Sequence, residues 1–376
     1  MIIAGEASGD AHAGRLVSAM RSMAPGLVFY GVGGAEMERA GVRILFPASR
    51  LSVVGATEVA ERMGDISEAY FLARELLALT RPGLLVLVDF PDFNLLAAKA
   101  AGKLGVKVLY YIAPQVWAWR SGRVKTIKRR ADHVAVILPF EKDIYEKAGV
   151  DVTFVGHPLL DREGGLPENA PPPGPPLVAL APGSRAGEIT RHLPLMLEAA
   201  ALIAARNPGV RFAVPVAPGI EPGLVEGIIR RGLSGLSAPP EIEIREGGMA
   251  RTLTEATAAV MVSGTVTLEA ALSGLPHVII YRLSRLSYRL GRLLIKVPHI
   301  GLANLIAETE VARELIQDDA NPGAIAGLIT EILADPGSAR RKMATVREKL
   351  GGPGASERTA RIALGLMNRK TEEIRP

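Results

Sequence analysis

A regular alternation of short apolar runs with helix-like stretches limits most strongly what this chain can fold into. Runs rich in valine, isoleucine and leucine occur at 83–90, 106–114, 132–140 and 152–158. Stretches of helical composition, such as 68–81 and 94–105, alternate with them. Wholly apolar runs of this length are typical of parallel strands buried on both faces, with helices as right-handed crossovers. The first part of the chain is therefore predicted to be an α/β domain.

The alternation stops at residues 161–176, where prolines and glycines leave no room for a helix or a central strand. We interpret this segment as an extended linker. Apolar runs then return at 177–185, 211–218, 241–247, 258–265 and 277–282. The sequence thus predicts two Rossmann-like parallel-sheet domains, 1–160 and 177–350. Ligands of open parallel sheets bind beyond the carboxyl ends of the strands, so we expect the active site in a cleft between the two sheets.

The composition narrows the classes of protein. Hydrophobic residues make up 48% and charged residues 22%, a globular balance, and the formal net charge of +5 suits anionic partners. Aromatic residues are only 5% and no long basic run occurs, which argues against nucleic acid. The absence of cysteine excludes disulfides, a thiol nucleophile and thiolate metal sites. With no signal peptide and no run of 18 apolar residues, we expect a chain that is soluble or lies on a membrane.

One strand-to-helix junction, 182–185, has the composition of a diphosphate site. Pro182, Gly183, Ser184 and Arg185 follow an apolar run, and a long helix is predicted from about Ile189. Backbone N–H groups at a helix start and a guanidinium both favour phosphate oxygens. An ordinary tight turn with a solvated arginine is the alternative.

A second junction repeats this design. Ser263, Gly264 and Thr265 end the next candidate strand, and Glu269 stands one turn into the following helix, where a carboxylate could accept both hydroxyls of a ribose. Simple helix capping is the commoner reason for this pattern. The glycine loop 246–250, with Gly248 and Met249, adds a third junction and favours a nucleotide diphosphate. No GxGxxG or GxxxxGK[ST] pattern occurs, which argues against a dinucleotide cofactor and a P-loop.

The first domain carries a different chemistry at "LVDFPDFN" (87–94). Asp89 follows an apolar run and should be partly desolvated, which would raise its pKa enough for it to accept a proton. Asp92 follows Pro91 and is better explained as a cap of the next helix. We infer no metal here, because histidines are scattered singly and no carboxylate cluster has ligand spacing.

Three further features stay open. His157, just before the linker, suits either a hinge or a substrate contact, and Trp117 and Trp119 suit either a cleft wall or core packing. Residues 281–298 form a basic amphipathic pattern that fits an anionic lipid surface or a solvated helix with a core-facing leucine stripe. The segment 53–79 could pack on the sheet or open towards an acyl chain.

Taken together, the motifs resemble one family. "AGEASGD", "DFPDFN", "APQVWAWR", "LPFEK", "FVGHPL", "APGSRAGEI", "SGTVTLEA" and "NLIA" match the lipid-A-disaccharide synthases in order and along nearly the whole chain. This resemblance implies a GT-B glycosyltransferase of lipid A biosynthesis. It would join UDP-2,3-diacylglucosamine to 2,3-diacylglucosamine 1-phosphate (lipid X) by inversion, releasing UDP and forming a β(1→6)-linked disaccharide.

The resemblance also implies no metal or other cofactor, no nucleic acid partner, and a peripheral place on the cytoplasmic face of a Gram-negative inner membrane. The C-terminal helix, about 355–376, would pack back on the first domain or exchange between the subunits of a homodimer. Members of the family usually have a complete first strand before the first glycine motif, whereas only Met1 to Ala4 precede it here, which indicates either a misassigned start codon or a trimmed strand.

Site residues follow from the matched motifs. Asp89 would be the base that deprotonates the acceptor hydroxyl. The UDP-sugar would contact Gly183, Ser184, Arg185, Glu188, Gly248, Met249, Ser263, Gly264, Thr265 and Glu269. The acceptor side of the cleft would use Glu6, Ser8, Gly9, Asp10, Asn94, Gln115, Trp117, His157 and Asn304. Within the opening loop, Gly9 would permit close approach, and Ser8 or Asp10 would cap the helix or touch the acceptor sugar.

Two other functions compete with this one. The first is another UDP-sugar GT-B enzyme, such as an epimerase or the peptidoglycan glycosyltransferase. The second is a nonenzymatic nucleotide-sugar sensor that kept the clefts and lost the chemistry. The intact "DFPDFN" argues against the sensor, and the whole motif series argues against the other enzymes.

Overall fold

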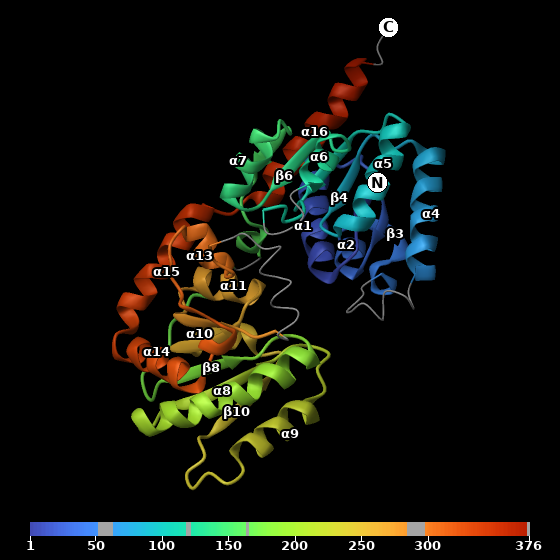
Figure 1. Cartoon of the computed structure of the whole chain (residues 1–376). Helices are drawn as coiled ribbons and strands as arrows, with labels where there is room; N and C mark the ends of the chain where they lie inside the picture. Colours follow the sequence, from blue (N-terminus) through green and yellow to red (C-terminus); the bar gives the residue numbers. More distant parts are fainter. Residues whose placement is uncertain (52–62, 118–121, 163–164, 284–297, 374–376) are drawn as a thin grey trace. The chain divides into compact units, whose positions relative to one another are not determined.

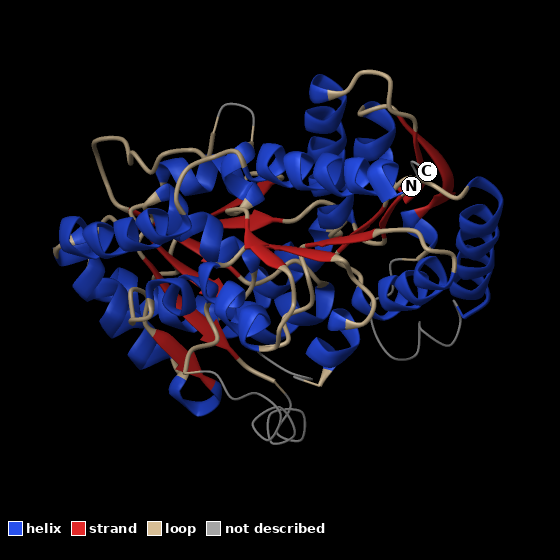
Figure 2. Cartoon of the chain, turned by 90° about the horizontal axis from the view of Figure 1, so that it is seen from above, coloured by secondary structure: helices blue, strands red, loops and turns tan. Residues whose placement is uncertain are grey.

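The computed structural model divides the chain into two compact units, residues 1–161 with 352–376 and residues 162–351. It describes residues 1–51, 63–117, 122–162, 165–283 and 298–373. Each unit is a layered α/β structure in which helices lie on both sides of the strands (Figures 1 and 2).

The first unit is built from alternating strands and helices. In chain order its elements are β1 (Ile2–Ala4), α1 (Ala7–Met23), β2 (Phe29–Gly33), α2 (Ala35–Arg39), β3 (Val42–Pro47), the 3₁₀ turn η1 (Ala48–Arg50), α4 (Met63–Thr80), β4 (Leu85–Val88), α5 (Pro91–Lys103), β5 (Val108–Tyr111), α6 (Arg123–Lys128), β6 (His133–Val136), α7 (Pro139–Lys147), β7 (Val152–Phe154), η2 (Pro158–Asp161) and α16 (Ala355–Glu373).

The second unit repeats the alternation. Its elements are β8 (Leu177–Ala181), α8 (Ala186–Arg206), β9 (Arg211–Val216), α9 (Pro222–Leu233), β10 (Ile242–Glu246), α10 (Met249–Glu255), β11 (Ala258–Val262), α11 (Thr265–Ser273), β12 (His277–Tyr281), α13 (Leu302–Ala307), β13 (Glu314–Ile316), η3 (Gln317–Asp319), α14 (Pro322–Ala334) and α15 (Pro336–Leu350).

Both sheets are parallel and share one strand order. Among the described residues, the first has seven strands in the order β3-β2-β1-β4-β5-β6-β7 and the second has six in the order β10-β9-β8-β11-β12-β13. This is the Rossmann order, which reverses direction between β1 and β4 in one sheet and between β8 and β11 in the other. The predicted fold class is confirmed, and the reversal points mark where each unit is expected to bind a ligand.

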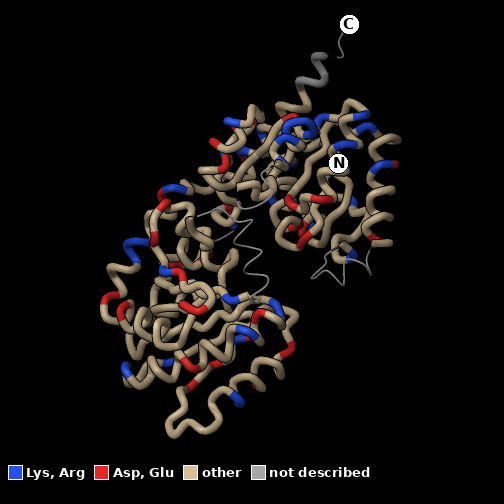
Figure 3. Tube along the Cα trace, viewed as in Figure 1, with Lys and Arg blue, Asp and Glu red and all other residues tan. Residues whose placement is uncertain are grey.

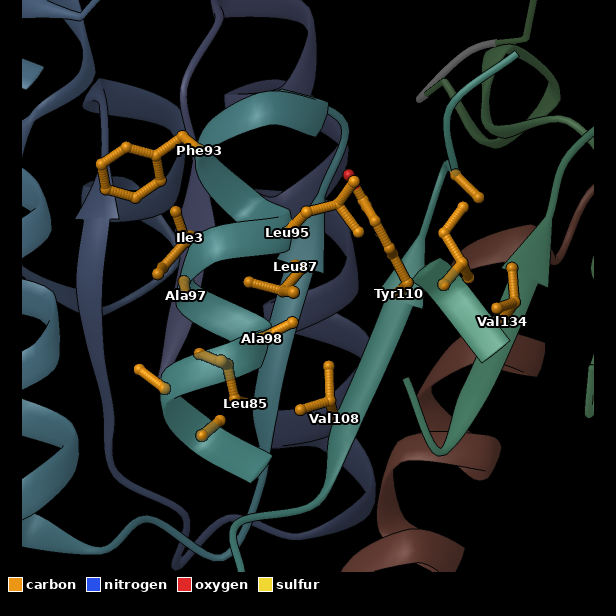
Figure 4. Packing of buried hydrophobic residues seen from close by; sticks show 14 of the residues in the cluster. Ile3, Leu85, Leu87, Phe93, Leu95, Ala97, Ala98, Val108, Tyr110 and Val134 are labelled. Carbon is orange, nitrogen blue, oxygen red and sulfur yellow. The ribbon is translucent and has the colours of Figure 1, made fainter. Parts of the chain in front are cut away.

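Burial explains why the apolar runs form central strands. All four residues of β4 are buried, and on one face Leu85 and Leu87 contact the helix α5 through Ala97 and Ala98 (Figure 4). The alanines let the helix approach the sheet closely. The opposite face is covered by α1 and α16. A strand covered on both faces has no solvent side, which explains the lack of apolar–polar alternation in its sequence.

Some elements were not predicted. The strands β2, β3 and β13 were missed. Strand β2 contains two glycines, β3 is exposed at Arg43 and Pro47, and β13 has only three residues, so none of them is a continuous buried apolar run. Helix α8 begins at Ala186, three residues before the predicted start, because Glu188 reaches back to the backbone N–H of Arg185 and completes the first turn.

The proline-rich segment 161–176, predicted to be an extended linker, has no helix or strand among its described residues beyond Asp161, but it is fastened to the second unit. Beyond Asp161 it belongs to the second unit. Asn169 is buried, and its amide donates to the carbonyl oxygens of Leu253 (2.7 Å) and Ala256 (2.8 Å). The prolines of this segment lack the backbone N–H that helices and sheets use. The extended segment is nevertheless held in place by the side-chain amide of Asn169.

Helix α16 packs against α1 in the first unit through Ala360, Ala363 and Leu366. Its N-terminus is capped by Asp161, whose carboxylate accepts the N–H groups of Gly354, Ala355 and Ser356 at 2.6–3.1 Å. Burial acts to raise the pKa of Asp161, but these hydrogen bonds outweigh it and the net pKa is lowered.

Candidate active site

The second unit contains a cavity at the reversal point of its sheet. Strands β8 and β11 are neighbours there, with Ala181 in register with Met261, so the loops that follow the two strands lie side by side. The cavity has a volume of about 500 Å³, which is in the usual range for a small-molecule site. Its lining includes the predicted residues Gly183, Ser184, Arg185, Glu188, Met249, Ser263, Gly264, Thr265 and Glu269.

The first of these loops depends on a glycine. Gly183 has a φ of +118°, and a Cβ added to it would lie 2.4 Å from Oε2 of Glu188. That oxygen accepts the N–H groups of Ser184 (2.9 Å) and Arg185 (3.3 Å). The two N–H groups predicted to bind phosphate are therefore bonded to Glu188, which also holds the Arg185 guanidinium at 3.1 Å. The loop is built to bind an anion, and a carboxylate of the chain fills that role here.

The second loop leads directly into α11. Gly264 and Thr265 are exposed at its N-terminus, where the helix dipole is positive. The Thr267 hydroxyl donates to the Gly264 carbonyl at 2.7 Å, and the Ser263 hydroxyl donates to the Ile300 carbonyl at 3.3 Å. These bonds fix the loop, and Gly264, Thr265 and Val266 at the start of α11 line the cavity.

Sequence reasoning missed part of the cavity wall. Pro215, Val216, Ala217 and Pro218, at the carboxyl end of β9, line the cavity, as does Gly247, whereas the predicted Gly248 does not. The signal for residues 215–218 was their position at the carboxyl end of the predicted strand run 211–218. The sequence alone did not show that these residues line the cavity, because this depends on β9 lying next to β8 in the sheet.

Glu269, predicted to bind a ribose, already has a partner within the second unit. The Arg162 guanidinium donates to both of its carboxylate oxygens, at 3.1 and 2.9 Å. The carboxylate is therefore fixed at the cavity wall by a bidentate fork.

In the first unit, Asp89 ends β4 at the corresponding reversal point. Asp89 and Phe90 have φ values of +50° and +46°, a left-handed conformation that costs about 1–2 kcal/mol per residue outside glycine. Hydrogen bonds hold this turn. The Asp89 carbonyl accepts from the Asn94 amide (2.6 Å) and the Tyr110 hydroxyl (3.0 Å), and its N–H donates to the Tyr111 carbonyl (3.2 Å). The turn ends the strand abruptly and directs the chain into α5.

The electrostatic environment of Asp89 suits proton transfer. Burial, reinforced by the negative charge of Glu6, raises the pKa of Asp89 to about 6, although a hydrogen bond from the Phe90 backbone acts against this rise. A carboxylate with a pKa near neutrality is ionised at pH 7 and is still basic enough to accept a proton.

The predicted opening loop, 5–10, is mostly helical, because α1 begins at Ala7, and Gly9 in the first turn of this helix lies beside the aspartate. Ala4 is in register with Val88, and a Cβ placed on Gly9 would be 3.9 Å from the Asp89 Cβ. A Cβ on Gly5 would lie 2.3 Å from the Phe90 ring, so glycine is required there for the ring to pack. Glu6 precedes α1 and Ser8 lies in its first turn, and both residues are exposed.

Asp10 was predicted to contact the acceptor sugar or to cap its own helix, and the structure shows neither role. It is 6% exposed, and its carboxylate accepts the N–H groups of Gly34 (2.7 Å), Glu36 (3.0 Å) and Met37 (3.2 Å). It therefore caps α2, a different helix from its own, and its bonding capacity is used structurally. Helix α1 itself has no side-chain cap, so Ser8 does not cap it either.

Asn304 and Asn94 are also structural, against their predicted place in the cleft. Both are completely buried. Asn304 belongs to the second unit, where its amide accepts from Val311 and Ala312 and donates to Glu314. Asn94 lies behind Asp89 and supports its backbone. The Asn94 NH2 group is bonded, whereas its Oδ1 is buried without a hydrogen-bond partner among the described residues. Because both side chains are completely buried, neither has a surface for a sugar.

The remaining predicted residues have mixed surroundings. Gln115 is exposed, and His157 is 5% exposed, with its Nδ1 accepting the Leu159 N–H at 3.2 Å. Trp117 donates to the carboxylate of buried Glu141 at 3.0 Å and packs edge-on against Phe140. Burial raises the pKa of Glu141 to about 7, although the Trp117 hydrogen bond lowers it.

Asp92 does not cap α5, contrary to expectation. Its side chain is 77% exposed and pairs with Arg123. It still lies in the first turn of α5, where a negative charge favours the helix dipole.

Several predicted features fall partly or wholly on residues that the structure does not describe. Residues 284–297 of the basic segment, residues 53–62 of the 53–79 segment, and Trp119 lie outside the described residues. Within the described part of the chain, His, Asp and Glu side chains form no group of three suited to a metal. None of the described helices is long and apolar enough to cross a membrane.

Comparison with known proteins supplies the family. A family model for lipid-A-disaccharide synthetase matches residues 1–363. The chain belongs to this family. The lipid-A-disaccharide synthase of Geobacter sulfurreducens is 45% identical over 380 residues, which cover 98% of this chain and 97% of that protein. As a member of the lipid-A-disaccharide synthetase family, the chain is a glycosyltransferase with the GT-B fold.

Solved structures are similar to this member of the family in fold alone. The UDP-GlcNAc 2-epimerase of Neisseria meningitidis, bound to UDP-GlcNAc, has a TM-score of 0.60 at 11% identity, covering 95% of this chain and 97% of that one. The MnaA protein of S. aureus, solved with UDP, has a TM-score of 0.63 at 14% identity, covering 97% and 96%.

Proposed function

We propose that the protein transfers a 2,3-diacylglucosamine residue from UDP to the 6-hydroxyl of 2,3-diacylglucosamine 1-phosphate (lipid X), with inversion. The observation that carries this proposal is the cavity of the second unit, in which nine of the ten predicted UDP-sugar residues gather. Family membership supplies the substrate class, and the similar fold of the MnaA protein, which was solved with UDP, is consistent with a nucleotide in such a cavity.

Arg185 and the α11 N-terminus would bind the diphosphate. As the bond between the anomeric carbon and the UDP oxygen breaks, negative charge develops on that oxygen, and a guanidinium with backbone N–H groups stabilises it. The Arg185 side chain is 63% exposed and is held by an ion pair with Glu188, so it can move to the phosphates at low cost.

Asp89 would be the general base. It would remove the proton of the acceptor hydroxyl while the oxygen forms a bond to the anomeric carbon on the face opposite UDP, which gives the β(1→6) linkage. Its raised pKa and its place at the reversal point of the first sheet support this role. The donor cavity and Asp89 belong to different units, so turnover would require both.

A lipid surface is proposed as a partner because of the groove between α4 and α5. This groove has a volume of about 610 Å³ and is lined by apolar Phe71 and Leu96 and basic Arg74, Lys99 and Lys103. Phe71 is 59% exposed and Leu96 is 47% exposed. The lining also includes Glu75, and α4 carries three acidic residues and one arginine, so two of the three basic side chains of the groove come from α5; Figure 3 marks Lys and Arg in blue and Asp and Glu in red. Exposed apolar side chains with a basic rim favour an anionic membrane. Replacing Phe71 and Leu96 by serine should reduce cosedimentation with anionic phosphatidylglycerol vesicles.

One assay tests the proposed reaction. Purified protein is mixed with UDP-2,3-diacylglucosamine and lipid X, and formation of tetraacyl disaccharide 1-phosphate and UDP is followed. Both products should appear in equal amounts. UDP binding without product would favour the nucleotide-sugar sensor, and an epimerised UDP-sugar without disaccharide would favour the epimerase.

Arg185→Ala tests the diphosphate role separately. Loss of a charge-assisted bond should weaken UDP binding by about tenfold or more. Unchanged UDP affinity would remove Arg185 from this role.

A further inference from the structure

The ion pair between Arg162 and Glu269 has a specific geometry. Nη1 of Arg162 lies 3.1 Å from Oε2 of Glu269, and Nη2 lies 2.9 Å from Oε1. Glu269 lines the donor cavity, whereas Arg162 does not, so the guanidinium contacts the carboxylate without filling the cavity. The side chain of Glu269 is 17% exposed and that of Arg162 is 37% exposed, so the pair is partly screened from water.

A fork of this kind determines how the carboxylate can be used. A glutamate side chain has several rotatable bonds, and two parallel hydrogen bonds to a planar guanidinium fix its orientation. An ionised carboxylate has about four acceptor positions, of which the fork takes two. Two positions are left for a pair of adjacent hydroxyl groups, and the side-chain entropy that ligand binding would otherwise lose is already lost.

The backbone of Arg162 is itself restrained. The Arg162 carbonyl accepts the Gly165 N–H at 2.8 Å, and further along the same segment the Asn169 amide donates to the Leu253 carbonyl at 2.7 Å, so the chain after Arg162 is fastened within the second unit. The guanidinium is therefore presented to Glu269 from a fixed main chain, even though Arg162 is distant from Glu269 in sequence.

We propose that Arg162 is a positioning residue that orients Glu269 towards the 2′- and 3′-hydroxyls of the donor nucleotide and so sets the preference for a ribonucleoside over a deoxyribonucleoside diphosphate. This rests on the proposed function, in which Glu269 binds the ribose. Arg162 touches neither the sugar nor the phosphates; it acts through the carboxylate.

The test compares UDP with 2′-deoxy-UDP by titration calorimetry on the full chain. The variants are Arg162→Ala, Arg162→Lys and, as a matched control, Arg313→Ala. The control removes a different arginine–glutamate pair of the second unit, Arg313 with Glu310, outside the donor cavity. Thermal unfolding of each variant establishes that it is folded. The wild type should bind UDP about tenfold or more tighter than 2′-deoxy-UDP.

Arg162→Ala should weaken UDP binding by about tenfold and 2′-deoxy-UDP binding by less than about twofold, so that the preference is largely lost. Arg162→Lys, which keeps the charge without the fork, should give an intermediate preference, and Arg313→Ala should match the wild type. If folded Arg162→Ala keeps the wild-type preference for UDP, the proposal is overturned. Tighter binding of both nucleotides by this variant would also overturn it, because Arg162 would then compete with the nucleotide for the Glu269 carboxylate. If the wild type itself shows no preference, the ribose role of Glu269 fails instead.

Discussion

The Asn94 side-chain amide donates a hydrogen bond to the backbone carbonyl of Asp89 across 2.6 Å. Asn94 is completely buried, and its amide also contacts the Val88 carbonyl. The left-handed turn at Asp89 and Phe90 is therefore held from behind by a residue five positions further along the chain. Asp89 would therefore perform the chemistry, whereas Asn94 would only hold the Asp89 backbone in place.

Asn94→Ala should lower kcat more than it changes UDP affinity. The change leaves the Asp89 carbonyl with the Tyr110 hydroxyl and opens a small space behind a strained turn, at a cost of about 1–3 kcal/mol in stability. Asn207→Ala, which removes a comparable amide bond at the far end of α8, should leave kcat unchanged. Steady-state kinetics and calorimetry measure both effects, and an unchanged kcat in folded Asn94→Ala would contradict the supporting role.

The pH dependence of kcat/KM should show an acidic limb. The general base must be ionised, and burial together with Glu6 raises the pKa of Asp89 to about 6. Activity should therefore rise as the pH increases through about 6 and then level off. Glu6→Gln removes one of the causes of the raised pKa and should move the limb to lower pH, whereas Glu38→Gln, an exposed acid on α2, should not. A limb that stays in place in Glu6→Gln would argue against Asp89 as its origin.

Gly183→Ala should damage the donor loop. Alanine is strained at a φ of +118°, and its Cβ would collide with the Glu188 carboxylate. We expect a loss of UDP affinity of about tenfold, since one or two kcal/mol of strain would be relieved by displacing the loop. Gly187→Ala is a matched control, because a Cβ there meets nothing within 4 Å and alanine favours the helix. Equal UDP affinities for the two variants would contradict this account of the loop.

Asp161→Ala should destabilise the first unit by about 1–2 kcal/mol, the usual value of a helix cap. Because the net pKa of Asp161 is lowered in the folded state, its contribution is present above the unfolded pKa of about 3.9 and is lost as the pH falls through the lower folded pKa. The difference in thermal midpoint between wild type and variant should thus be full at pH 7 and should shrink below about pH 4. Asp143→Ala, at an exposed position on α7, serves as the control.

The sequence predicted most of the strands, such as β4 and β11, because wholly buried parallel strands have a continuous apolar composition, but it missed β2, β3 and β13. It did not predict which junctions are neighbours. Residues 183–185 and 263–265 are about eighty positions apart and meet only because β8 pairs with β11. The same holds in the first unit, where β1 pairs with β4 and brings Gly9 beside Asp89.

Polar residues near glycine motifs were the main source of error. Asp10 and Asn304 are polar residues close to glycines, which made them candidates for the site. Both are buried, and their side chains are bonded to backbone groups of neighbouring segments. Conversely, Arg162 stands in a proline- and glycine-rich stretch that predicted nothing beyond an extended chain. Its contact with Glu269 spans 107 positions, and no local pattern in the sequence encodes it.

The central claim is that Asp89 is the general base, and Asp89→Asn tests it most directly. The amide is nearly the same size as the carboxylate but cannot accept the hydroxyl proton. Single-turnover formation of disaccharide from UDP-2,3-diacylglucosamine and lipid X should fall by about 10²–10⁴-fold, while UDP affinity and the thermal midpoint stay close to wild type. Turnover within a fewfold of wild type, in a variant that binds UDP normally, would contradict the claim.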